Sequence, residues 1–199
     1  MKMKIPILIL AGGQGKRMGY RNKAQLQIAK ITFLEKILAQ FQDIPCYIST
    51  RPSYTPEFSG VKLVIDKNSD RGPVEGIMQA FLQTDQSAFF VIGCDMPLMN
   101  RQVYEELCAQ FESPKGVAIQ TEKRLYTLGA IYTRTMVEEM VQKLEKKDYR
   151  LKTLFQDGRA KILTTDQIKV DLECFMNINF EEEYKQFCDR YSNKEGESE

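Results

Sequence analysis

The stretch IPILILAGGQGKRMGYRNK, residues 5–23, joins an apolar run to a glycine-rich turn and several cations. The run from Ile5 to Leu10 predicts a buried strand that stops at glycines, where the backbone can turn sharply and approach a ligand closely. Exposed N–H groups of such a turn, with Arg17 and Lys23 nearby, suit a polyphosphate. We therefore favour a phosphate-binding loop over an ordinary turn whose charges face water. The glycines concerned are Gly12, Gly13 and Gly15.

Two common phosphate-binding motifs do not fit this loop. A P-loop requires a glycine, four further residues and then Gly-Lys-Ser/Thr, but Leu10 stands at the first position and Arg17 at the last. A dinucleotide fingerprint G-x-G-x-x-G would begin at Gly13 and meet Met18 where its third glycine belongs. The loop must therefore bind phosphate by another scheme.

Length and composition are those of an ordinary globular protein. A chain of 199 residues predicts one domain, residues 1–191, and the polar segment 192–199 is expected to be a disordered tail. The net charge of +1 gives no reason to expect nucleic acid or a membrane as a partner. No apolar run approaches the length of a membrane span. We expect a cytoplasmic monomer.

The chain contains no histidine, which excludes imidazole bases, Ser-His and Cys-His nucleophiles and histidine zinc sites. Its five cysteines show no C-x-x-C spacing, and most of them are read as small core residues in a reducing compartment. Any chemistry must therefore come from carboxylates, cations or backbone dipoles, with or without a hard metal ion.

Strand and helix patterns alternate along the chain. The capping box Thr32-x-x-Glu35 and the apolar spacing after it predict a helix from Thr32 to Gln42. Further helices are expected from Pro73, after Asn100, over residues 136–144 and 151–155, and over Glu181–Tyr191. This rhythm predicts a Rossmann-like three-layer α/β/α domain with a mainly parallel sheet, in which 117–120 and 125–132 are compatible with an antiparallel pair. The predicted strands are Ile5–Leu10, Ile44–Thr50, Val61–Ile65, Ala88–Gly93, Val117–Gln120, Leu125–Tyr132, Ala160–Leu163 and Phe175–Ile178.

Polar residues follow several of these strands, and the carboxyl ends of strands are where open α/β sheets bind ligands. Ser49 to Arg51, Asp66 and Asp95 join the glycine loop in this respect. Asp95 directly follows a buried strand, so its carboxylate could hold Mg²⁺ between phosphate oxygens. The alternative is a helix cap or a turn former.

Two motifs carry a resemblance to a known family. Leu10 to Lys23 reads L-A-G-G-x-G-x-R-M-G-x-x-x-K, which resembles the start of the nucleotidyltransferases that load a nucleoside monophosphate onto a phosphorylated acceptor. Within them the match is to the molybdenum cofactor guanylyltransferase family. Cys94-Asp95-Met96-Pro97 matches that family's C-D-x-P turn, where the aspartate is the magnesium ligand. The resemblance implies a fold similar to the nucleotide-diphospho-sugar transferases.

Further segments are similar to the same family. Asp66 corresponds to an aspartate that contacts the nucleotide, and Ser49 stands where an asparagine is common. Residues 72–76, Gly-Pro-Val-Glu-Gly, resemble a G-P-L-A-G loop with Glu75 in place of the alanine. The resemblance thus implies a nucleotide-binding set of Leu10, Ala11, Gly12, Gly13, Gly15, Lys23, Ser49, Asp66, Gly76 and Asp95.

Asn177-Ile178-Asn179 resembles the family's N-x-N segment, with Phe180 and Glu181 in place of Thr and Pro. The resemblance implies that both asparagines face the acceptor substrate. The alternative is that they only tie off the last strand through hydrogen bonds from side chain to backbone.

The activity implied is transfer of GMP from GTP to molybdopterin carrying molybdenum, with release of pyrophosphate. In this scheme Asp95 holds Mg²⁺, and Arg17 and Lys23 balance the charge of the triphosphate. Proteins that deliver the pterin would be partners. Two alternatives stay open: a related transferase that uses CTP or another acceptor, such as cobinamide phosphate or a sugar phosphate, and a GTP-binding module without turnover.

Overall fold

A seven-stranded sheet with the order β5-β4-β1-β6-β8-β7-β9 forms the centre of the computed structural model, which describes residues 4–13, 15, 18–19, 21–68, 70–156 and 158–191. The first four strands of this order run parallel, β8 is antiparallel to both neighbours, and β7 and β9 are parallel. The mainly parallel sheet is therefore confirmed, as is the antiparallel pairing of β7 with β8. The strands are β1 (Ile7–Leu10), β4 (Cys46–Thr50), β5 (Val61–Ile65), β6 (Ala88–Gly93), β7 (Gly116–Gln120), β8 (Leu125–Thr133) and β9 (Ala160–Thr164).

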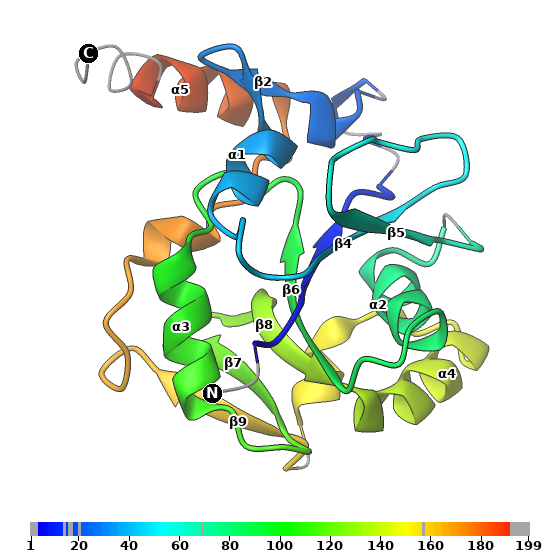
Figure 1. The fold of residues 1–199 in the computed structure, drawn as a ribbon. Coiled ribbons are helices and arrows are strands. Elements are labelled where there is room, and N and C mark those ends of the chain that lie inside the picture. Colours follow the sequence, from blue (N-terminus) through cyan, green and yellow to red (C-terminus); the bar gives the residue numbers. More distant parts are fainter. Residues whose placement is uncertain are drawn as a thin grey trace.

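Helices cover both faces of the sheet, which confirms the three layers (Figure 1). One apolar cluster includes Leu34 and Ile37 of α1 with Val103 and Leu107 of α3. A second cluster, on the opposite face, contains the buried apolar residues of α2 and α4. The helices are α1 (Phe33–Ala39), α2 (Pro73–Leu82), α3 (Arg101–Gln110), α4 (Val137–Glu145) and α5 (Glu181–Tyr191), with 3-10 turns η2 (Lys23–Gln25), η3 (Arg134–Met136), η4 (Leu151–Phe155) and η5 (Leu172–Phe175).

Local signals fix the starts of these helices. Thr32 caps α1: its Oγ1 accepts a hydrogen bond from Glu35 N at 3.1 Å, and Glu35 Oε2 accepts one from Thr32 N at 2.7 Å. Asn100 caps α3 by accepting from Val103 N at 3.2 Å. The predicted helix over Thr32–Gln42 is real but shorter, since it begins after its cap and ends at Ala39.

A small hairpin and the last helix form a third cluster beside the sheet. Strands β2 (Gln27–Ile28) and β3 (Ile31–Thr32) pair antiparallel, and α5 lies beside this hairpin in Figure 1. Phe33 and Phe187 meet edge to face with ring centroids 5.5 Å apart. The Tyr184 hydroxyl donates to Gln27 O at 2.7 Å. The hairpin therefore connects the segment after the glycine loop to the end of the described chain.

The predicted strand Phe175–Ile178 is wrong. Asp171 Oδ1 accepts a hydrogen bond from Glu173 N at 2.9 Å and starts η5, which includes Phe175. Residues 176–179, which follow η5, have no regular structure, and Ile178 N donates to Asp95 O at 2.9 Å. Phe175 and Ile178 are both buried. The apolar pattern thus reflected burial of side chains, which a loop can also provide.

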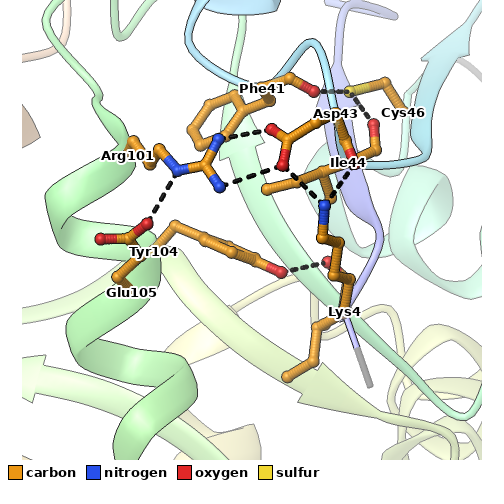
Figure 2. A network of polar contacts seen from close by, with 9 residues as sticks. Lys4, Phe41, Asp43, Ile44, Cys46, Arg101, Tyr104 and Glu105 are labelled. Atoms are coloured by element: carbon orange, nitrogen blue, oxygen red, sulfur yellow. Dashed lines mark hydrogen bonds and ion pairs between the residues drawn. The ribbon is translucent and has the colours of Figure 1, made fainter. Parts of the chain in front are cut away.

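A network of charged groups fixes the entry into β1 and β4 (Figure 2). Lys4 Nζ donates to Asp43 Oδ2 at 2.6 Å, and Arg101 Nη2 donates to the same oxygen at 3.1 Å. The Tyr104 hydroxyl donates to Ile5 O at 3.0 Å. Hydrogen bonds from Arg101 and Lys4 hold the pKa of Asp43 well below its usual range. These contacts join α3 to the sheet through the segments that precede β1 and β4.

Three further expectations concern membrane-spanning segments, the tail 192–199 and the burial of the cysteines. In the part of the chain that the structure describes, no helix is long and apolar enough to cross a bilayer. Segment 192–199, predicted to be disordered, lies outside that part. The expectation of cysteines as core residues holds for Cys46, Cys94 and Cys174, which are buried.

Candidate active site

A cavity of about 490 Å³ opens at the carboxyl ends of β1, β4, β5 and β6. This is where the topology of an open α/β sheet places ligands. The lining comes from the glycine loop, the ends of three further strands, the start of α2 and one residue each from β8 and the segment before α5. It consists of Leu10, Ala11, Gly12, Gly13, Gly15, Lys23, Ser49, Asp66, Asn68, Asp70, Gly72, Pro73, Gly76, Gly93, Cys94, Asp95, Leu128 and Asn179.

Strand register brings the polar groups together. Leu10, the last residue of β1, lies opposite Ser49 of β4 on one side and Gly93 of β6 on the other. Ala11 N donates to Ser49 O at 2.7 Å, and Cys94 N donates to Leu10 O at 3.1 Å. The three strands therefore end level with one another, so residues that follow them share one edge.

Two glycines allow this close approach. A Cβ on Gly12 would lie 2.1 Å from Asp66 Oδ2, and a Cβ on Gly76 would lie 2.3 Å from Ser49 Oγ. Both distances are far below van der Waals contact. Gly12 thus leaves room for the Asp66 carboxyl, and Gly76 lets the first turn of α2 pack directly on β4.

Burial raises the pKa of Asp66 to about 6, and the negative charge of Glu75 acts in the same direction. The hydrogen bond from Ser49 Oγ to Asp66 Oδ1, at 2.6 Å, and the positive charge of Arg51 act against it. Asp66 is 8% exposed. The site therefore holds a carboxylate in an environment that disfavours its charge, as is common where a group serves binding or catalysis.

Asp66→Asn is expected to stabilise the protein without ligand at pH 7.5. Because the pKa is higher in the folded than in the unfolded chain, this group's contribution to stability is full below about pH 4 and is lost as pH rises through about 6. Asparagine does not ionise, so it avoids the loss of stability that Asp66 causes at pH 7.5, and it can still accept a hydrogen bond from Ser49. The free energy of unfolding should therefore rise by on the order of 2 kcal/mol. Denaturant unfolding at pH 7.5 and 4.5 measures this. Equal effects at both pH values, or a similar gain in the exposed control Asp85→Asn, would contradict it.

Lys23, Asp95 and Asn179 meet at the cavity wall. Lys23 Nζ donates to Asp95 Oδ2 at 2.9 Å and to Asn179 Oδ1 at 2.7 Å. Lys23 begins η2, which Asn22 caps by accepting from Ala24 N at 3.1 Å. The side chains of Lys23 and Asp95 are 18% and 17% exposed. The pair is thus shielded from bulk water, and its geometry leaves it reachable from the cavity.

The acidic side chains of the cavity suit a metal ion that takes most of its ligands from water and substrate. Among the described residues, no group of three or more histidine, cysteine or acidic side chains could hold a metal ion. A cation at Asp95 would therefore take its other ligands from water and substrate. Mg²⁺ fits this description, since it keeps several waters and is commonly bound by one or two carboxylates with substrate phosphates.

Every residue predicted to bind the nucleotide lines the cavity, and so does Asn179. Asn177, predicted to face the acceptor, does not line it. Arg17 lies outside the described residues. Sequence reasoning missed Asn68, Asp70 and Leu128. The first two follow Asp66 in a turn rich in polar residues, which was a usable signal. Leu128 gave none, since its position depends on the pairing of β8 with β6.

Comparison with known proteins places this fold and cavity in an enzyme of the nucleotidyltransferase class. The chain matches the family described as MobA-like NTP transferase domain over residues 7–162, and it belongs to this family. It is 32% identical over 184 residues to a protein of Clostridium perfringens named probable molybdenum cofactor guanylyltransferase, with 89% of this chain and 92% of that protein covered. A protein of the same name from Aquifex aeolicus is 26% identical, with coverages of 89% and 87%.

Solved structures share the fold at lower identity. Molybdopterin-guanine dinucleotide biosynthesis protein A from Archaeoglobus fulgidus has a TM-score of 0.81 and 17% identity, covering 95% of this chain and 100% of that one. The 2-C-methyl-D-erythritol 4-phosphate cytidylyltransferase from Thermus thermophilus has a TM-score of 0.68 and 14% identity, with 94% and 98% covered. Proteins that share this fold therefore carry names that specify different nucleotides.

Proposed function

We propose that this protein transfers GMP from GTP to the phosphate of a molybdopterin-type molybdenum cofactor and releases pyrophosphate. The observation that carries the proposal is the contact of Lys23 with Asp95 and Asn179 in a cavity lined by the glycine loop. The names of the relatives from C. perfringens and A. aeolicus support the same reaction.

In the proposed reaction, an oxygen of the acceptor phosphate attacks the α-phosphorus of GTP. A bond forms between that oxygen and the α-phosphorus, and the bond from the α-phosphorus to the bridging oxygen breaks, so that pyrophosphate leaves with its electron pair. No covalent intermediate with the protein is needed. The chain contributes orientation and charge balance, which dominate phosphoryl and nucleotidyl transfer.

The described residues suggest distinct roles. The backbone of residues 11–13 would approach the phosphates, and Lys23 would move from Asp95 to the triphosphate or bridge both. Asp95 would hold Mg²⁺, which supplies positive charge between phosphate oxygens when it is bound. Asp66 and Ser49, at the other end of the lining, would contact the nucleoside. Asn179 would contact the acceptor, because it shares Lys23 with Asp95.

A thermal-shift panel with GTP, CTP, ATP and UTP, each with Mg²⁺, tests the nucleotide. A ligand at one hundred times its dissociation constant stabilises the folded state by about 2.7 kcal/mol, and each kcal/mol raises the Tm of a chain of this size by roughly 2–4 °C. We expect GTP to give a clearly larger shift than CTP. Four equal shifts would mean that only the phosphates are recognised.

The same panel separates the alternatives. A larger shift with CTP would favour a cytidylyltransferase, and no shift with any nucleotide would contradict the proposed site. Release of pyrophosphate only when molybdopterin is added, with the dinucleotide product identified by mass, would support the transfer. Binding of GTP without release of pyrophosphate in the presence of the acceptor would favour a module without turnover.

A further inference from the structure

A stripe of polar side chains runs along helix α2 to its C-cap, the exposed Gln83, and the remaining buried residues of the helix are apolar or small. Glu75, Gln79 and Gln83 follow one another at intervals of four residues and so share one face. Gln83 Nε2 donates to Gln79 Oε1 at 3.0 Å, and Gln79 Nε2 donates to Glu75 Oε1 at 3.0 Å. Glu75 is 1% exposed and Gln79 is 2% exposed. Buried polar groups are costly unless they are bonded, so this stripe calls for an explanation.

The stripe binds the outer edge of β5, the last strand on its side of the sheet. Gln83 Nε2 donates to Ile65 O at 2.8 Å, and Gln83 Oε1 accepts from Ile65 N at 3.1 Å. Two residues further along the chain, Lys67 N donates to Glu75 Oε1 at 3.2 Å. Side chains of α2 and of its C-cap thus occupy the place that a neighbouring strand would take.

Asp66 lies between the two backbone positions that the stripe binds. Its own N–H points the other way and donates to Thr50 O at 2.8 Å. Its carboxyl accepts from Ser49 Oγ and lines the cavity. The backbone around Asp66 is therefore held from both sides, by β4 through one set of hydrogen bonds and by α2 through the other.

Glu75 is the charged member of the stripe and its link to the segment after Asp66. Its Oε1 accepts both from Lys67 N and from Gln79 Nε2, and its Oε2 lies 3.5 Å from Arg71 Nη1. Loss of an acceptor that serves two buried or partly buried donors leaves those donors without a partner, which costs more than the bonds contribute.

We propose that Glu75 is a positioning residue for Asp66, which it holds at the cavity wall in the orientation that accepts hydrogen bonds from the nucleotide. This inference rests on the proposed function, in which Asp66 contacts the nucleotide. Within the part of the chain that the structure describes, the charged groups that act on Asp66 are Glu75 from α2 and Arg51, which follows β4. Glu75 therefore acts on the carboxyl in two ways, through the backbone and through its charge.

A double-mutant cycle tests the path from Glu75 to Asp66. The dissociation constant of GTP with Mg²⁺ is measured by calorimetry for Glu75→Ala, Asp66→Asn and the double variant, with Glu145→Ala, at an exposed residue of α4, as the matched control. Glu75→Ala should weaken GTP binding by about tenfold or more, since hydrogen bonds to a charged group contribute about 1.5–3 kcal/mol. In the Asp66→Asn background the same change should have little further effect.

The dependence of GTP affinity on pH gives a second test. A purely structural role of Glu75 would leave this dependence unchanged. Ionised Asp66 is the better acceptor, so affinity for GTP should rise with pH through the pKa of Asp66. Burial is the main cause of the raised pKa of Asp66; Glu75→Gln keeps an acceptor for both donors but removes the negative charge that adds to this effect. Its affinity at pH 7.5 should stay near that of the unmodified protein, while the rise moves to lower pH. Titration of the nucleotide is common to all variants and cancels in the comparison.

The possible results distinguish a failure of this inference about Glu75 from a failure of the proposed function on which it rests. If Glu75→Ala weakens binding equally in both backgrounds, Glu75 does not act through Asp66 and the inference fails alone. If Asp66→Asn binds GTP normally, the nucleotide role of Asp66 fails as well. Should Glu75→Ala lack a cooperative thermal transition, the pH profile of Glu75→Gln decides: an unmoved profile overturns the inference.

Discussion

Asp95→Asn is expected to lower the rate of GMP transfer by roughly 100- to 1,000-fold while the fold is retained. The substitution keeps the shape of the side chain and its contact with Lys23, but it removes the negative charge that would hold Mg²⁺ against the triphosphate. Without that charge, the ion is bound mainly by the substrate and is no longer fixed relative to the glycine loop. Steady-state rates at saturating GTP and acceptor, measured over a series of Mg²⁺ concentrations, provide the test.

The control for this prediction is Asp85→Asn, at an exposed aspartate before β6. It should transfer GMP at the normal rate. The Tm of Asp95→Asn should lie within a few degrees of the control, so that lost activity cannot be attributed to unfolding. Normal transfer that still depends on Mg²⁺ in Asp95→Asn would remove this residue from the mechanism.

Lys23→Ala is expected to raise KM for GTP by about 10- to 100-fold, because a hydrogen bond to a charged group commonly contributes about 1.5–3 kcal/mol. The matched control is Lys185→Ala, which replaces an exposed lysine of α5. It should leave KM for GTP unchanged. Lys23→Ala also leaves the shielded Asp95 carboxylate without its cation. Added Mg²⁺ should therefore raise the Tm of Lys23→Ala more than that of the control. Unchanged kinetics and no such effect of Mg²⁺ would mean that Lys23 is only part of a solvated surface.

The sequence predicted what local physics determines. Strand ends followed by glycine or aspartate are visible in the order of residues, and a parallel sheet then gathers them at one edge, as Gly12, Asp66 and Asp95 illustrate. The caps at Thr32 and Asn100 are equally local, since each involves residues three positions apart.

Contacts between distant segments could not be predicted in the same way. Leu128 lines the cavity only because β8 pairs with β6 in one particular register. The loop that contains Ile178 looked like a strand because burial of its side chains produces the same apolar pattern. The buried Glu75 differs from the alanine of the resembled motif, and its partners become apparent only when α2 lies along the edge of β5.

The contact between Lys23 and Asn179 joins residues 156 positions apart, and α5 packs on the hairpin that follows the glycine loop. During translation at about 5–20 residues per second, the glycine loop would leave the ribosome roughly 8–30 s before the segment that completes its surroundings. A nascent chain would therefore expose the apolar surface of the hairpin, and Phe33 at the start of α1, throughout that interval. We expect this interval to be the period in which the growing polypeptide depends most on chaperones.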